Sequence, residues 1–132
     1  MNILGIDFGL KKIGLALANT ESQLVDPLGT IEVKHKTQEV IRRIKTICEK
    51  EKVGKIVVGL PESGIVKKVK QFGNQLNKTT KLPIVYVDET LTSKEAIVRM
   101  IELGRRRKAR RKKEDQFAAA LILQNYFNKN YV

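Results

Sequence analysis

Apolar and polar residues fall into stretches with two different periods, and these predict the order of strands and helices. Residues 2–7 and 13–18 are short apolar runs rich in β-branched residues and leucine, separated by a turn that contains Gly9. This pattern is typical of an antiparallel hairpin, and a third strand is expected over residues 28–33. The first run stops on an acid, Asp7, so a carboxylate stands where an apolar strand ends.

The middle of the chain alternates between helical spacing and continuous apolar runs. Residues 37–52 carry apolar side chains at helical spacing and predict a helix with one buried face, on which the single cysteine, Cys48, is a core residue. Residues 55–61, "KIVVGLP", and 82–89, "LPIVYVDE", each contain a short continuous apolar run, as in strands buried on both faces, and the second ends on acids. Between them, residues 63–77 return to helical spacing.

The last third predicts two helices on either side of a basic run. Residues 92–103 begin with capping-box spacing and are followed by a glycine, so they predict a helix. Residues 105–113, "RRRKARRKK", are basic at every position but one, and are interpreted either as a solvated loop or as a phosphate-binding segment. The stretch "EDQFAAALILQNYF" then predicts a buried helix with Glu114 and Asp115 in its first turn.

These elements predict one domain that spans residues 1–132, a usual size for a single core. The first three strands form a meander, and the fourth and fifth are reached through helices as parallel crossovers. The predicted fold class is therefore α/β: a five-stranded mixed sheet, with three antiparallel strands plus two parallel ones, flanked by helices.

Charge and composition narrow the possible functions. The chain has 26 Lys and Arg against 14 Asp and Glu, a net charge of +12, which favours a polyanionic partner. No apolar run approaches the roughly 18 residues of a membrane helix, so we expect a cytoplasmic protein without membrane contacts. With one Cys and one His the chain cannot form an internal disulfide or a Cys/His zinc site, so any metal must be bound by oxygen.

Aspartates that could provide those oxygens lie at the ends of predicted strands and at the start of the last predicted helix. Asp7 ends the first strand, Asp88 and Glu89 end the fifth, and Asp115 begins the last helix, whereas Asp26 lies in a predicted turn. Functional groups collect at the carboxyl ends of strands in open α/β sheets. Each acid also has an ordinary interpretation as a turn, strand-end or helix-dipole residue, but all three positions fit one rim in the predicted element order.

Carboxylates that converge on one rim repel one another unless a cation lies between them. Mg²⁺ and Mn²⁺ take oxygen ligands of this kind. Two such ions about 4 Å apart can bridge a scissile phosphate, activate a water and stabilise the leaving oxygen. The acids and the basic run together therefore predict a metal-dependent nuclease.

The chain resembles the YqgF/RuvX family in four motifs that occur in the family's order: "GIDFGLKKIGLAL", "IVVGLP", "VDETLTSKEA" and "EDQFAAALILQNYF". Members are described as Holliday-junction resolvases and as nucleases that process the 5′ end of pre-16S rRNA. The resemblance implies an RNase H-like fold and two Mg²⁺ or Mn²⁺ ions, bridged by Asp7. It implies catalytic roles for Asp7, Glu89 and Asp115, with Asp88 as a further metal ligand. A rRNA precursor and branched DNA both remain open as substrates.

The chain departs from the family pattern in two places. The loop after "GLP" is shorter than usual, which shortens one wall of the cleft, and Thr90 stands where the family commonly has Arg. Lys11 or Lys12, in the hairpin turn, is expected to supply the missing cation. Further nucleic-acid contacts are expected from the basic run: Arg105, Arg106, Arg107, Lys108, Arg110, Arg111, Lys112 and Lys113.

Two other functions agree with part of the sequence. The "GIDFG" hairpin also resembles the first phosphate loop of actin-like and Hsp70-like ATPases, but those proteins enclose the nucleotide between two lobes and this chain supplies one. A module that binds RNA or DNA without cleaving it has the same charge, because phosphate contacts give affinity without chemistry. Monomer and homodimer are both compatible with the sequence.

Overall fold

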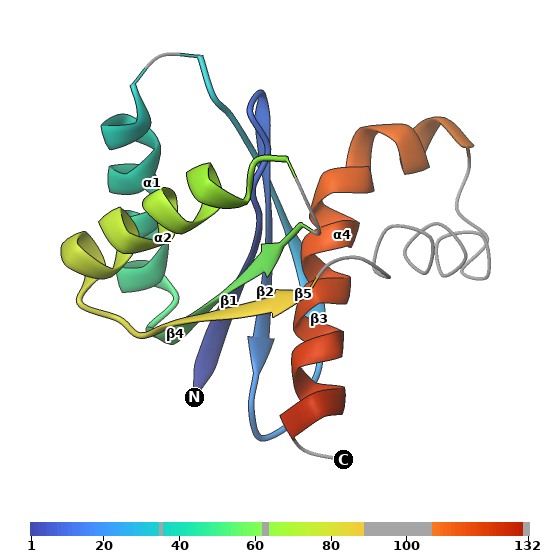
Figure 1. Ribbon diagram of the computed structural model, residues 1–132. Coiled ribbons are helices and arrows are strands. Elements are labelled where there is room, and N and C mark those ends of the chain that lie inside the picture. Colours follow the sequence, from blue (N-terminus) through green and yellow to red (C-terminus); the bar gives the residue numbers. More distant parts are fainter. Residues whose placement is uncertain (35, 62–63, 89–106, 131–132) are drawn as a thin grey trace.

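The computed structural model describes residues 1–34, 36–61, 64–88 and 107–130 of the chain (Figure 1). Its five strands form one sheet in the order β3-β2-β1-β4-β5. The strands and helices, in chain order, are β1 Asn2–Asp7, β2 Lys12–Asn19, β3 Val25–Glu32, α1 Thr37–Lys50, β4 Val53–Leu60, α2 Val66–Thr80, β5 Ile84–Asp88 and α4 Arg107–Asn130. The helix predicted at residues 92–103 lies outside the described residues.

The sheet is mixed in the way the sequence predicts. β1 pairs antiparallel with β2, and β2 with β3, whereas β1–β4 and β4–β5 are parallel. The predicted α/β class, with a mixed sheet of three antiparallel strands and two parallel ones, is confirmed. β1 lies in the middle of the sheet, so its carboxyl end has a neighbouring strand on both sides.

Helices cover both faces of the sheet. Figure 1 shows α1 and α2 together on one face and α4 across the other. The α1/α2 face buries an aliphatic core that includes Leu4, Ile6 and Ile44. The α4 face buries a second core built on Ile3, Val57 and residues of α4. Cys48 is 4% exposed in the first core, which agrees with its predicted structural role.

Gly5 brings α4 directly onto β1. A Cβ at this position would lie 2.5 Å from Leu123 Cγ and 2.9 Å from the Ala119 carbonyl oxygen, both in α4. Such distances leave no room for a side chain, so only glycine allows this close packing. Because side chains alternate along a strand, residues 3, 5 and 7 of β1 share the α4 face, and Leu4 and Ile6 take the other.

The two end strands differ from the sequence prediction. β3 begins at Val25, so Asp26 and Pro27 belong to the strand and not to a turn. Pro27 pairs with Ala16 next to a register shift, and an end strand tolerates proline because its missing N–H can face away from the sheet. β5, expected to be buried on both faces, is the end strand on the other side, where only Val87 is fully buried.

α4 begins seven residues earlier than predicted. It starts at Arg107 and runs to Asn130, so residues 107–113 of the basic run are helical and Asp115 lies two turns inside the helix. Arg, Lys and Ala are among the best helix formers, and the sequence offers no Gly or Pro after Gly104 to stop the helix. Among the helices of the described part, none is both long and apolar enough to cross a membrane.

Candidate active site

Asp7 occupies the carboxyl end of the central strand. It is the last residue of β1, is half-buried, and lies on the α4 face with Ile3 and Gly5. β4 and β5 run parallel to β1, so the carboxyl ends of all three strands share this edge of the sheet. The predicted position of Asp7 at the rim of an open sheet is therefore confirmed.

Glycines flank Asp7 on both neighbouring strands. Gly14 of β2 is its direct antiparallel partner, and partners across a ladder share a face. In β4, Val57 packs on the α4 face and Val58 on the other, so Gly59 returns to the α4 face. Since Val58 pairs with Ile6, Gly59 follows at the level of Asp7. Neither neighbouring strand therefore places a side chain beside the carboxylate.

Sequence reasoning did not identify Gly14 and Gly59 as part of the site. The available signal was the hairpin itself: in a two-strand register, the residue opposite Asp7 can be counted from the turn. The contribution of β4 could not be counted in this way, because parallel register depends on tertiary packing.

The hairpin turn after Asp7 presents the two predicted lysines at the same edge. A Cβ at Gly9 would lie 2.5 Å from the Lys12 carbonyl oxygen, so this tight turn excludes any side chain at residue 9. The Val33 N–H donates a hydrogen bond to the Lys11 carbonyl at 2.8 Å, which ties the turn to the end of β3. Lys11 and Lys12 are both exposed.

α4 runs in the direction opposite to β1. Tyr126, late in α4, accepts a 3.0 Å hydrogen bond from the Lys55 ammonium, and Lys55 pairs with Ile3, early in β1. Ala119 and Leu123, earlier in α4, lie over Gly5. Moving backwards along α4 therefore leads towards the carboxyl end of β1, as Figure 1 also shows.

This direction brings position 115 of α4 to the level of Asp7. Residues 115, 119 and 123 follow one another at i, i+4 spacing and share one side of the helix. From Ala119 back to position 115 the helix advances about 6 Å, and from Gly5 to Asp7 the strand advances about 6.7 Å. The backbone of α4 thus places Asp115 next to the end of β1, although its side chain lies outside the described part.

Asp88 lies on the opposite face of the sheet. Val85 and Val87 pack on the α4 face, whereas Ile84 and Tyr86 pack against the α1/α2 core. By the same alternation Asp88, the last residue of β5, belongs to the α1/α2 side. The structure therefore brings Asp7 and position 115 together and separates Asp88 from them.

The remaining predicted site residues lie wholly or partly outside the part of the chain that the structure describes. Glu89, Arg105 and Arg106 lie outside the described residues. The other basic residues, Arg107, Lys108, Arg110, Arg111, Lys112 and Lys113, lie in the first two turns of α4, and their side chains are outside the described part. Among side chains that the structure describes, no three of His, Cys, Asp or Glu come together as a metal site.

The donors at this edge fit a hard divalent cation. Asp7 offers carboxylate oxygen, and α4 brings a second Asp position to its level. Oxygen-only donor sets suit Mg²⁺ and Mn²⁺ and not the softer metals that prefer Cys or His. Glu89 would be needed to complete a set of three.

Sequence comparisons identify relatives over almost the whole chain. The RuvX family model, described as Holliday junction resolvase, matches residues 1–129. A protein of Rickettsia canadensis named "Putative pre-16S rRNA nuclease" is 40% identical over 128 residues, which cover 92% of this chain and 82% of the relative. A Mycoplasma genitalium protein of the same name is 36% identical over 135 residues, 98% of this chain and 97% of the relative.

Solved structures share the fold. The RuvC of T. thermophilus in complex with a Holliday junction substrate has a TM-score of 0.67 at 16% identity, over 100% of this chain and 98% of that chain. The fowlpox virus Holliday junction resolvase has a TM-score of 0.64 at 14% identity, over 98% and 99%. The fold is therefore RNase H-like. With a family match from residue 1 to residue 129, the chain belongs to the RuvX family of Holliday junction resolvases.

Proposed function

We propose that this chain is a metal-dependent nuclease that hydrolyses phosphodiester bonds in structured nucleic acid, and that residues 1–132 form one such domain. The observation that carries the proposal is the meeting of Asp7 and position 115 of α4 at the carboxyl edge of the sheet, beside Gly14 and Gly59. Family membership supports the nuclease class.

Asp7, Glu89 and Asp115 would hold one or two Mg²⁺ or Mn²⁺ ions. Alternation that continued beyond β5 would return Glu89 to the face of Asp7, which is why we assign the role to Glu89 and not to Asp88. When bound, the ions would lower the pKa of the attacking water and stabilise charge on the leaving oxygen. Asp7, at the end of a paired central strand, would orient its oxygens with little reorganisation.

Cations of the chain would hold the substrate around this centre. Lys11 ends the turn after Asp7 and Lys12 begins β2, and both would contact phosphates near the cleaved bond. The basic residues at the start of α4 would attract the backbone of a longer nucleic acid. These contacts would position the substrate without reading its sequence.

Pre-16S rRNA is the first substrate we propose, because the sequence relatives are named "Putative pre-16S rRNA nuclease"; its 5′ end is the part that the family resemblance implies. A Holliday junction is the second, because the family model describes that activity and the T. thermophilus RuvC neighbour holds one. Both substrates would place the protein in the cytoplasm.

The experiment compares wild-type and Asp7→Asn protein on two labelled substrates, a 5′-extended small-subunit rRNA precursor and a four-way DNA junction, with Mg²⁺, Mn²⁺ or EDTA. We expect metal-dependent cleavage by the wild type and a loss of at least about 10²–10³-fold in the variant. Binding should stay unchanged or become tighter, because the substitution removes a negative charge near the phosphates. The preferred substrate then identifies the pathway.

Two outcomes would contradict the proposal. Cleavage by Asp7→Asn at the wild-type rate would mean that the reaction occurs elsewhere on the chain. Tight binding of both substrates without cleavage, at any metal concentration, would instead favour a binding module that keeps the RNase H-like fold.

A further inference from the structure

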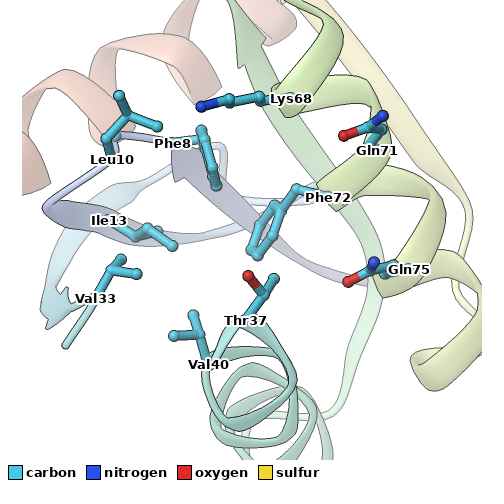
Figure 2. A pocket seen from close by; sticks show the side chains of 11 residues that line it. Phe8, Leu10, Ile13, Val33, Thr37, Val40, Lys68, Gln71, Phe72 and Gln75 are labelled. Carbon is cyan, nitrogen blue, oxygen red and sulfur yellow. The ribbon is translucent and has the colours of Figure 1, made fainter. Parts of the chain in front are cut away.

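A concave feature lies behind the Asp7 hairpin, on the face of the sheet opposite Asp7. It is a pocket of about 320 Å³ between the hairpin turn, α1 and α2 (Figure 2). Phe8, Gly9 and Leu10 of the turn line it. Phe8 directly follows Asp7, so the pocket and the candidate active site share one edge of the sheet and lie on its two sides.

The floor of the pocket is apolar and aromatic. The rings of Phe8 and Phe72 meet with their centroids 4.8 Å apart and their planes tilted by 43°. Ile13, Val33 and Val40 surround them in Figure 2. Leu10 stands at the rim with 54% of its surface exposed, so its side chain is accessible to a ligand in the pocket.

The walls add a defined set of polar groups. Lys68, Gln71 and Gln75 come from successive turns of α2, and Thr37 comes from the start of α1. Figure 2 shows the Lys68 ammonium extended over Phe8 towards the hairpin turn. A carboxamide can both donate and accept hydrogen bonds, and none of the lining residues that the structure describes carries a carboxylate.

The surroundings of the pocket favour an anion. α2 contains four lysines, Lys67, Lys68, Lys70 and Lys78, and no acid. Two of these lysines lie in its first turn, where the helix dipole is unfavourable for cations. Neither α2 nor the described lining of the pocket contains a carboxylate that could neutralise these lysines. A bound phosphate would neutralise them.

We propose that this pocket binds one unpaired nucleobase of the substrate, with an adjacent phosphate at Lys68. The base would pack against Phe8 and Leu10, its polar edge would meet Gln71 and Gln75, and the backbone would cross the hairpin turn to reach Asp7. The inference rests on the proposed function for the identity of the ligand, and it adds a base-binding site that the cleavage chemistry does not require.

The test measures binding in EDTA, so it does not depend on cleavage. The probe is a labelled RNA duplex with a single-stranded 5′ extension, in which an abasic site replaces one unpaired base at a time. For the wild type, we expect one position at which the abasic site weakens binding about five- to a hundredfold, as for loss of a stacked base. The other positions should matter little.

Gln71→Glu and Asn74→Glu make a matched pair of variants. Both change the net charge equally and both side chains are exposed on α2, but only Gln71 lines the pocket. We expect Gln71→Glu to weaken binding of the intact RNA and to reduce the penalty of the critical abasic site towards onefold. Asn74→Glu should keep that penalty.

Leu10→Ser and Leu24→Ser form a second pair that leaves charge unchanged. Both leucines are exposed near hairpin turns, at 54% and 70%, and only Leu10 lines the pocket. Leu10→Ser should weaken binding, and Leu24→Ser should not. Equal effects within each pair, or an abasic penalty that is the same in Gln71→Glu and the wild type, would overturn the proposal. If the protein behaves as expected in these binding tests but cleaves neither substrate, the base-binding proposal stands and the nuclease proposal is overturned.

Discussion

Gly5 of β1 lies directly against Leu123 of α4, so closely that a Cβ at residue 5 would come within 2.5 Å of the leucine Cγ. This contact fixes how close α4 lies to the central strand and where along the strand Leu123 and Ala119 lie. The position along the strand in turn determines which residue of α4 stands at the level of Asp7, two positions further along β1. The candidate active site thus depends on a glycine that carries no chemical group of its own.

Gly5→Ala should therefore lower both stability and activity. The added methyl group must displace Leu123 or the Ala119 carbonyl, an overpacking that costs about 1–3 kcal/mol. Displacement of α4 should also reduce cleavage, since position 115 moves with the helix. Denaturant unfolding and the cleavage assay measure the two effects.

Gly54→Ala is the matched control for Gly5→Ala. Its Cβ would meet only the Met1 side chain and, at 4.0 Å, the Asn2 carbonyl. The Met1 side chain is long, unbranched and 49% exposed, so it can move aside at small cost. A loss of stability in Gly54→Ala as large as in Gly5→Ala would mean that the α4 contact is not the cause.

Asp88→Asn should reduce cleavage far less than Asp7→Asn. Asp88 belongs to the α1/α2 side of β5, whereas Asp7 shares the α4 face with position 115. We expect Asp88→Asn to retain activity within about tenfold, against a loss of about 10²–10³-fold for Asp7→Asn. Cleavage rates at several Mg²⁺ concentrations make the comparison. Equal losses with the same weakening of metal dependence would return Asp88 to the ligand set.

Replacing Arg105, Arg106 and Arg107 by Ala should reduce the salt dependence of binding. Each lost phosphate contact lowers the slope of log affinity against log salt by about one. Titrations of a four-way DNA junction at several salt concentrations measure the slope. As a control with the same charge change, the substitutions Arg43→Ala, Lys45→Ala and Lys50→Ala are made together in α1, on the far face of the sheet from α4. If both triple variants gave the same slope, the basic run would make no special contacts.

Cys48 should be nearly unreactive in the folded protein. Burial, with a smaller contribution from Glu49, raises the pKa of its thiol from 9.0 to about 11. The reactive thiolate is thus about a hundredfold rarer at pH 8 than at a pKa of 9.0. Folding keeps the thiol protonated up to a higher pH than in the unfolded chain. The contribution of Cys48 to the free energy of unfolding is therefore complete below pH 9 and is lost as the pH rises towards 11.

Alkylation by iodoacetamide at pH 8 measures this directly, because the chain has no other cysteine. The native protein should react far more slowly than the same protein unfolded in urea. Equal rates in the two states would show that Cys48 is accessible and is not buried in the core on the α1/α2 face of the sheet.

Several features of this protein follow from local sequence. The apolar run that stops at Asp7 predicts both the strand and the carboxylate at its end, because a period of two and a terminal polar residue are properties of adjacent positions. The helical spacing of Val40, Ile41 and Ile44 predicts the buried face of α1 in the same way, and all three are buried. The element order and the mixed sheet follow from these local patterns together with the usual handedness and lengths of connections.

Local patterns were misleading where two local tendencies competed. The charge of residues 107–113 suggested a loop, but the helix propensity of Arg, Lys and Ala continues α4 through them. Pro27 suggested a turn, but an end strand has one side without a ladder and accepts it.

The sequence by itself thus determined which residues carry chemistry and that most of them stand at element ends. Only the tertiary structure decided which of them share a face: Asp7 with position 115 of α4, beside Gly14 and Gly59, and apart from Asp88. The physical reason is that this choice depends on parallel register and on the contact between Gly5 and Leu123. Both join residues that are far apart in the chain, and local periodicity in the sequence does not indicate which distant residues are in contact.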